Sequence, residues 1–117
     1  MVKTLGLDAL EEAMVSTIPA DIEASAIDIL KAYPVKRAAL FGSATKGGMT
    51  EQSDLDMLVE FMPDTRGIVF FSLHTDLEQK CGRSVDLLTF EALEREARGL
   101  FKENVIREMK VIYEREG

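Results

Sequence analysis

Three short apolar runs, the last two separated by a helical pattern, constrain most strongly what this chain can fold into. The runs extend from Val35 to Phe41, from Leu55 to Phe61 and from Ser84 to Leu88. Each has the length of one buried β-strand and is too short for an ordinary helix. Helical patterns precede the first run, separate the second from the third and follow the last, so the sequence predicts an α/β (α+β) fold, a small mixed β-sheet flanked by helices.

The boundaries of the helical patterns carry recognisable signals. Pro34 ends the helix before the first run, because the residue that precedes a proline is disfavoured in the helical conformation. Gly82 is well placed as a left-handed C-terminal cap. Thr89 is a candidate N-cap for the last helical region, which is either one helix or two helices broken near Gly99. The helical patterns themselves occupy residues 7–33, with a short helix over 7–15 and a second after Thr17, residues 68–81, and residues 90–115.

Length and composition exclude several classes of protein. A chain of 117 residues fits one domain, so we expect a single domain over 1–117 with a motif-bearing core at about 35–93. No stretch approaches the roughly 18 apolar residues that a membrane span needs, so no membrane partner is expected. Cys81 has no second cysteine with which to form a disulfide, and the N-terminus is not signal-like, so the chain is expected to be cytoplasmic.

The charge balance argues against direct binding of nucleic acid. The chain carries 21 acidic and 14 basic side chains, which gives a formal net charge of −7. Proteins that bind nucleic acids usually present a basic face to the phosphates. An acidic protein of this size is better suited to docking on a basic protein partner.

A glycine-rich turn follows the first predicted strand. Phe41 runs directly into Gly42-Ser43, and Gly47 follows four residues after the serine. Glycine allows the backbone to approach a ligand closely, and a helical turn after it would direct free amides at an anion. The turn is therefore a candidate phosphate cradle, although most Gly-Ser turns are only turns.

Two carboxylates stand at the entrance of the second predicted strand. Asp54 and Asp56, in the segment Ser53-Asp54-Leu55-Asp56, lie two residues apart and so project from the same side of a strand. Adjacent carboxylates repel each other unless a cation lies between them, and oxygen ligands favour a hard divalent ion such as Mg²⁺. The alternative is a solvated acidic strand entrance with no ligand.

A third acid lies inside the third apolar run. Asp86 is flanked by Val85 and Leu87, and charges are rarely placed in such a run without a partner. If this strand neighbours the second one, three carboxylates converge beside the Gly-Ser turn, as in sites where two metal ions hold a triphosphate. The alternative is an ion pair between Asp86 and one of three bases, Arg37, Lys36 or Arg83.

Together these motifs resemble a known signature. Gly42-Ser43, Gly47 and Ser53-Asp54-x-Asp56 resemble the DNA polymerase beta-like nucleotidyltransferase superfamily, whose palm-like fold the resemblance implies. The small size and the later segment Gly82-Arg83-x-Val85-Asp86-Leu87 resemble, more narrowly, the minimal nucleotidyltransferase (MNT) family. Members of that family are often antitoxins encoded beside a HEPN-domain ribonuclease toxin. The similarity covers about half of the chain, Val35 to Leu93.

The resemblance implies an activity and a role for each matching residue. The reaction is transfer of AMP from ATP to a hydroxyl group, and in antitoxin members the acceptor is a tyrosine of the partner HEPN toxin, in a complex that can be oligomeric. Two Mg²⁺ ions would be bound by Asp54, Asp56 and Asp86, the last of which would also act as, or help position, the base. The nucleotide would be bound by Gly42, Ser43, Lys46, Gly47 and Ser53.

Two other functions stay open from the sequence. The chain could be a non-catalytic antitoxin that neutralises its toxin by forming a complex, or it could modify a small molecule, although no added domain that would shape an acceptor pocket is visible. Family members commonly carry Arg where this chain has Lys46 and Ala where it has Thr45. Lysine lacks the planar fork that grips a phosphate, so weaker nucleotide binding is expected.

Three further side chains are candidates for the same region. Arg66 and Arg83 could reach a triphosphate, although surface salt bridges are the simpler expectation. His74 is expected to be a surface or packing residue of its helix rather than a base.

Overall fold

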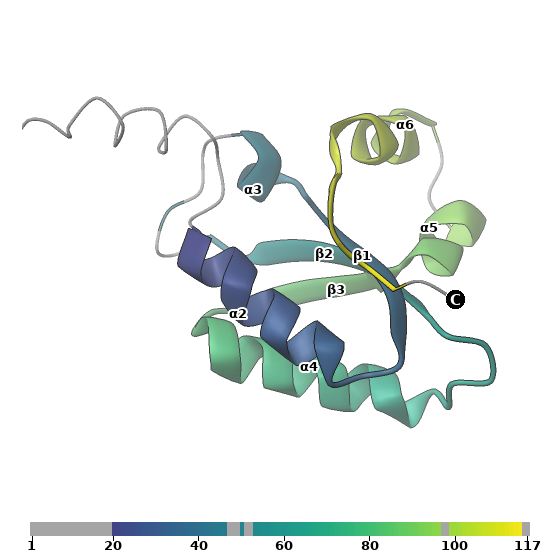
Figure 1. Cartoon of the computed structure of the whole chain (residues 1–117). Coiled ribbons are helices and arrows are strands. Elements are labelled where there is room, and N and C mark those ends of the chain that lie inside the picture. Colours follow the sequence, from purple (N-terminus) through teal and green to yellow (C-terminus); the bar gives the residue numbers. More distant parts are fainter. Residues whose placement is uncertain (1–19, 47–49, 51–52, 97–98, 116–117) are drawn as a thin grey trace, which may run out of the picture.

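The computed structural model describes residues 20–46, 50, 53–96 and 99–115. The helix predicted over residues 7–15 lies outside the described residues. The elements follow in the order α2 (Ala20–Lys31), β1 (Val35–Phe41), α3 (Ser43–Lys46), β2 (Leu55–Phe61), α4 (Ile68–Cys81), β3 (Val85–Thr89), α5 (Phe90–Glu96), α6 (Gly99–Glu108) and β4 (Lys110–Glu114), as labelled in Figure 1.

The described strands form one mixed sheet in the order β3-β2-β1-β4. Strand β1 is antiparallel to both β2 and β4, whereas β2 and β3 run parallel and are joined through α4. Parallel neighbours need such a crossover connection, because a tight turn can only return the chain antiparallel. The predicted small mixed sheet flanked by helices is therefore confirmed, with β1 and β2 at the predicted bounds and β3 shifted by one residue.

The sheet is covered differently on its two faces. On one face, α2 and α4 lie side by side and pack on Leu55, Met57 and Val59, all of which are fully buried. On the other face, a smaller cluster joins β1 and β2 to the C-terminal helices through Phe41, Leu58, Leu93 and Val105. Burial of each large apolar side chain contributes about 1.5–3 kcal/mol, so most of the packing energy lies on the α2–α4 face. The smaller cluster leaves part of its face open.

The predicted helix boundaries are mostly confirmed. Helix α4 ends at Cys81, and Gly82 follows it with a φ of 68° while its amide donates to the carbonyl of Glu78. The Thr89 hydroxyl accepts a hydrogen bond from the Ala92 amide at 2.9 Å, as an N-cap does. The last helical region is two helices, and the second begins at Gly99. Among the described residues, no helix is long and apolar enough to cross a membrane.

The helical prediction for residues 90–115 is wrong at its end. Residues 110–114 form β4, which pairs with β1 through partners such as Ala38 and Tyr113. The helical spacing of apolar residues stops at Met109, and the following Val-Ile-Tyr is a sequence of β-formers. The backbone groups of β1 on the side away from β2 need partners, and β4 supplies them.

Candidate functional site

The two carboxylate motifs meet on neighbouring strands. Asp56 of β2 and Asp86 of β3 are direct register partners in the parallel pair. Asp54 immediately precedes β2 and lies two residues from Asp56, whereas Leu55 between them is buried in the core below α2 and α4. Asp54 and Asp86 are exposed, and Asp56 is partly buried. The predicted adjacency of the two acidic strands is therefore confirmed.

Negative charge accumulates around Asp56, and no side chain that the structure describes neutralises it. Burial raises the pKa of the Asp56 carboxyl, and the negative charges of Asp86 and then Asp54 raise it further. Among the side chains that the structure describes, which exclude that of Lys46, no basic group forms an ion pair with any of the three acids. The alternative that Asp86 pairs with Arg37 is wrong, because Arg37 Nε binds Glu60 Oε1 at 2.8 Å. The three acids thus form a negatively charged edge that would favour a cation.

Gly42 brings the end of β1 against the same edge. It has a φ of 70°, and the preceding residue, Phe41, pairs with Asp56 in the sheet. A Cβ atom on Gly42 would lie 3.1 Å from Cγ of Asp56 and closer still to its Oδ2. Both the sign of φ and the contact with the carboxylate therefore require glycine at this position. The glycine turn and the carboxylates, which are separate motifs in the sequence, are one site in the fold.

The turn after Gly42 is closed by Thr45. The amide and the hydroxyl of Thr45 each donate to the Gly42 carbonyl, both at 3.0 Å. The departure from the family's usual alanine therefore supplies an added hydrogen bond at the start of α3. Gly47 and the side chains of Ser43 and Lys46 lie outside what the structure describes, so their assignment to the nucleotide stays a prediction.

Ser53 takes part in a turn that leads into Asp54. Its hydroxyl accepts a hydrogen bond from the Thr50 amide at 2.9 Å and lies 3.2 Å from the Thr50 hydroxyl. The Ser53 amide in turn donates to the Thr50 carbonyl at 3.1 Å. Here Ser53 shapes the backbone before the carboxylate, and its predicted contact with the nucleotide stays a prediction.

Two side chains of α4 hold the backbone next to Asp86, and sequence reasoning missed them. His74 Nε2 lies 2.7 Å from the Val85 carbonyl oxygen, and Glu78 Oε2 accepts the Val85 amide at 2.9 Å. His74 and Glu78 also approach each other, with 3.3 Å between Nε2 and Oε2. The available signal was their spacing of four residues, which puts both on one side of a helix. His74 thus contacts the backbone of β3, which agrees with its expected role as a surface or packing residue.

The donor set fits a hard divalent cation by its chemistry. Three carboxylates supply oxygen ligands only, which is the preference of Mg²⁺, and their mutual repulsion is relieved when a cation binds. Within residues 20–46, 50, 53–96 and 99–115, no group of three or more His, Cys, Asp or Glu side chains is arranged to hold a metal as it stands. Binding would therefore have to draw the three carboxylates closer together.

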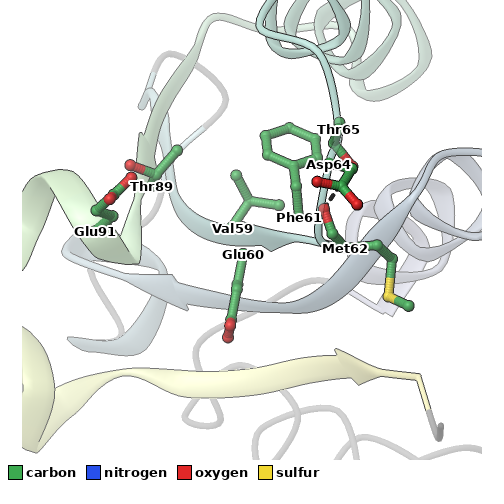
Figure 2. A pocket seen from close by; sticks show the side chains of 8 residues that line it. All are labelled: Val59, Glu60, Phe61, Met62, Asp64, Thr65, Thr89 and Glu91. Carbon is green, nitrogen blue, oxygen red and sulfur yellow. Dashed lines mark hydrogen bonds between the residues drawn. The ribbon is translucent and has the colours of Figure 1, made fainter.

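A cavity of about 450 Å³ lies at the opposite end of the β2–β3 pair. In Figure 2, Thr89 and Glu91 lie on one side of Val59, whereas Asp64 and Thr65 lie on the other. Its hydroxyls are already used: Thr65 donates to the Met62 carbonyl at 2.6 Å, and Thr89 caps α5. No convergent set of free polar groups remains there, and the cavity is not the candidate reaction site.

Comparison with protein families and curated proteins gives concordant matches. A family described as "Polymerase beta, Nucleotidyltransferase" matches residues 25–117. A protein of Methanocaldococcus jannaschii that is provisionally named a protein adenylyltransferase is 37% identical over 73 residues, which cover 62% of this chain and 78% of the relative. A second protein of that organism with the same kind of name is 43% identical over 56 residues, which cover 48% of this chain and 57% of the relative.

Solved structures share the fold. A minimal nucleotidyltransferase, so described provisionally, has a TM-score of 0.59 at 26% identity, covering 89% of this chain and 93% of that one. A toxin–antitoxin crystal structure with AMP-PNP gives a TM-score of 0.62 at 24% identity, covering 80% and 73%. A Shewanella oneidensis complex of a tri-AMPylated HEPN toxin with an MNT antitoxin gives 0.56 at 21% identity, covering 80% and 71%.

Proposed function

The chain belongs to the polymerase beta nucleotidyltransferase family, and from that premise we propose that it transfers AMP from ATP to a protein hydroxyl at the Asp54–Asp56–Asp86 edge. The observation that carries the proposal is the register pairing of Asp56 with Asp86 directly beside Gly42. The clustered carboxylates, the glycine turn beside them and membership of a family of nucleotidyltransferases are together accounted for by this one activity.

Each residue of the edge has a part in the proposed reaction. Asp54, Asp56 and Asp86 would hold Mg²⁺, and the ion would supply charge neutralisation for the triphosphate. Gly42 lets the backbone approach the phosphates, and the nucleotide-binding role extends to Ser43, Lys46, Gly47 and Ser53. The acceptor oxygen forms a bond to the α-phosphorus while the bond to the β-phosphate oxygen breaks and pyrophosphate leaves. The proton of the hydroxyl passes to the base that Asp86 provides or positions.

The proposed acceptor is a tyrosine of a HEPN-domain toxin, so that the chain acts as the antitoxin of a toxin–antitoxin pair. The support is the fold shared with an MNT antitoxin that was solved in complex with a tri-AMPylated HEPN toxin. The formal charge of −7 suits docking on a basic partner. ATP as donor is supported by the similar toxin–antitoxin structure with AMP-PNP.

The decisive experiment is a transfer assay with a HEPN-domain protein as the acceptor. The two proteins are incubated with α-labelled ATP and Mg²⁺, and the modified residue is located by mass spectrometry. We expect AMP on a toxin tyrosine with wild type and with the distant control Glu91→Gln, and none with Asp54→Asn. Transfer that persists in both Asp54→Asn and Asp56→Asn would refute the proposed site.

The same variants separate catalysis from simple occlusion. A non-catalytic antitoxin would neutralise its toxin by complex formation, so Asp54→Asn would still protect cells at stoichiometric levels. Under the catalytic proposal, protection by wild type exceeds protection by Asp54→Asn when the antitoxin is limiting, because one enzyme molecule modifies many toxin molecules.

A further inference from the structure

We infer that Arg83 is a positioning residue that fixes Asp54 for cation binding by holding the backbone on its N-terminal side. This inference rests on the proposed function, because it assigns Asp54 to the cation. Arg83 Nη1 donates to two carbonyl oxygens, that of Thr50 at 3.0 Å and that of Ser53 at 3.1 Å. These carbonyls belong to the turn that leads directly into Asp54.

The same short segment also holds the C-terminal side of Asp54. The Leu55 amide donates to the Ser84 carbonyl at 2.9 Å, and Ser84 is the neighbour of Arg83. Asp54 itself is exposed, and within the described part of the chain it has neither a hydrogen bond nor an ion pair of its own. Its position is therefore set by its two neighbours, Ser53 and Leu55, and both are bound by the Arg83-Ser84 dipeptide.

Arg83 is half-buried, and its Nη1 atom is turned toward this backbone. Arg83 Nε is buried, and no described residue accepts a hydrogen bond from it. A buried donor without a partner is costly, so the two bonds from Nη1 must more than offset that cost for the side chain to stay in place. An arginine that binds phosphate would instead keep the nitrogen atoms of its guanidinium group free at the open edge. Arg83 therefore acts through the backbone, and it is not a catalytic residue.

This arrangement couples two of the three carboxylates. Arg83 precedes Asp86 by three residues and lies just before β3, which begins at Val85, while its side chain holds the turn before Asp54. Arg83 thus contributes, together with the Leu55–Ser84 backbone bond, to the spacing between Asp54 and Asp86. Groups that orient metal ligands in this way typically change metal affinity by about 10–100-fold when they are removed.

The test measures Mn²⁺ binding to the full chain by electron paramagnetic resonance, which requires no turnover. Arg83→Met keeps the aliphatic stem and removes the donors, and we expect the Kd for Mn²⁺ to rise by about tenfold. Arg83→Lys restores a donor that can reach backbone carbonyls, and it should return the Kd to within about threefold of wild type. Arg95→Met, on exposed α5, is the matched control and should leave the Kd unchanged.

A double-mutant cycle shows whether Arg83 acts through Asp54. In the Asp54→Asn background, Arg83→Met should cause no further loss of Mn²⁺ binding, because the ligand that it positions is already gone. Fully additive losses, or an Arg83→Met Kd equal to that of wild type, would overturn the inference. An Arg83→Met variant with a higher KM for ATP and unchanged Mn²⁺ affinity would also overturn it, since an arginine that binds the phosphates directly would give that pattern.

The outcomes separate this inference from the proposed function. Wild-type binding that is lost in Asp54→Asn but unaffected in Arg83→Met would refute the role of Arg83 alone. Absence of Mn²⁺ binding in the wild type would instead refute the cation site, and the inference with it. If Arg83→Met unfolds, as judged by its melting curve, Arg83→Gln, whose shorter side chain cannot reach both carbonyls, replaces it as the loss variant, and Arg83→Lys stays the rescue variant.

Discussion

The two ends of the β2–β3 pair are both acidic, yet only one has the character of a reaction site. At the end where β2 begins, Asp56 faces Asp86 across the ladder and no described base pairs with either. At the other end, Glu60 is paired with Arg37 at 2.8 Å, and the Arg37 guanidinium also lies 4.1 Å from the centroid of the Phe90 ring. The first end keeps its charge unbalanced, and the second end neutralises it internally.

The difference separates acidic residues that are paired within the fold from acidic residues to which we assign a cation. An internally paired carboxylate contributes to folding on its own. An unpaired, partly buried one such as Asp56 opposes folding until a cation arrives, and its raised pKa is the signature of that cost. The variants below test this contrast, beginning with the largest expected effect.

Asp56→Asn should have the largest effect on activity and the opposite effect on stability. Loss of a charge that the site needs should reduce AMP transfer by at least about 100-fold, the scale on which single electrostatic groups act in catalysis. Without metal at neutral pH, the variant should melt at a higher temperature than wild type. The cost of burying a charged carboxylate and its repulsion by Asp86 and Asp54, which raise the pKa of Asp56, are absent from the variant. The transfer assay measures the loss of activity, and scanning calorimetry without Mg²⁺ measures the change in melting temperature.

The pH dependence of the free energy of unfolding tests whether the charged form of Asp56 destabilises the fold. Because the folded-state pKa of Asp56 is raised, the folded protein binds its proton more tightly than the unfolded chain does. The free energy of unfolding therefore falls as pH rises from the ordinary carboxyl pKa through the raised one. Asp56→Asn should lack this loss. If Asp56→Asn is less stable than wild type at neutral pH without metal, the charged Asp56 carboxylate does not destabilise the fold, and this part of the account is wrong.

Gly42→Ala should have the next largest effect, and it should damage both properties together. The residue has a φ of 70°, and the new Cβ would collide with the Asp56 carboxylate. Backbone strain alone costs about 1–3 kcal/mol, and displacement of Asp56 should lower transfer as well. Chemical denaturation and the transfer assay check the two effects. Gly82→Ala, which has open space around its Cβ, is the control for strain without the collision, and it should retain activity.

Glu60→Gln should have a smaller effect, and on stability only. The pair with Arg37 is partly exposed, so its loss should lower the free energy of unfolding by about 0.2–1 kcal/mol. AMP transfer should stay within twofold of wild type. A loss of transfer comparable to that of Asp56→Asn would mean that the two ends of the strand pair are not functionally distinct.

Glu91→Gln should have the smallest effect. Its contact with Arg95 is 3.9 Å long, and both side chains are mostly exposed. The expected change in unfolding free energy is below about 0.5 kcal/mol, with unchanged transfer. Urea denaturation checks the first value, and a larger change in either property would show that the cavity end takes part in function.

The parts of the fold that depend on local pattern could be predicted from the sequence. Val35–Phe41 and Leu55–Phe61 are runs whose length and flanking signals fix a strand, and Gly82 marks the end of α4. The partnership of Asp56 with Asp86 needed one added assumption, that their strands are neighbours. Strand β4 could not be predicted from periodicity, because its five residues follow a helix directly and are specified by the unpaired edge of β1.

The supporting contacts around the site were not predictable in the same way. Arg83 binds backbone carbonyls, and backbone groups have no identity in the sequence. His74 and Glu78 likewise bind the amide and carbonyl of Val85, which depends on how α4 lies along the edge of β3. Motifs therefore identify the groups that would touch ligand, whereas the groups that orient them become visible only in the fold.

The most direct measurement of the central claim is calorimetric binding of Mg²⁺ with an ATP analogue that cannot be cleaved between the α- and β-phosphates. The account predicts binding to wild type and to Glu91→Gln, with loss of binding in Asp56→Asn. Equal affinity for wild type and Asp56→Asn, or loss of binding in Glu91→Gln alone, would contradict the assignment of nucleotidyl transfer to the Asp54–Asp56–Asp86 edge.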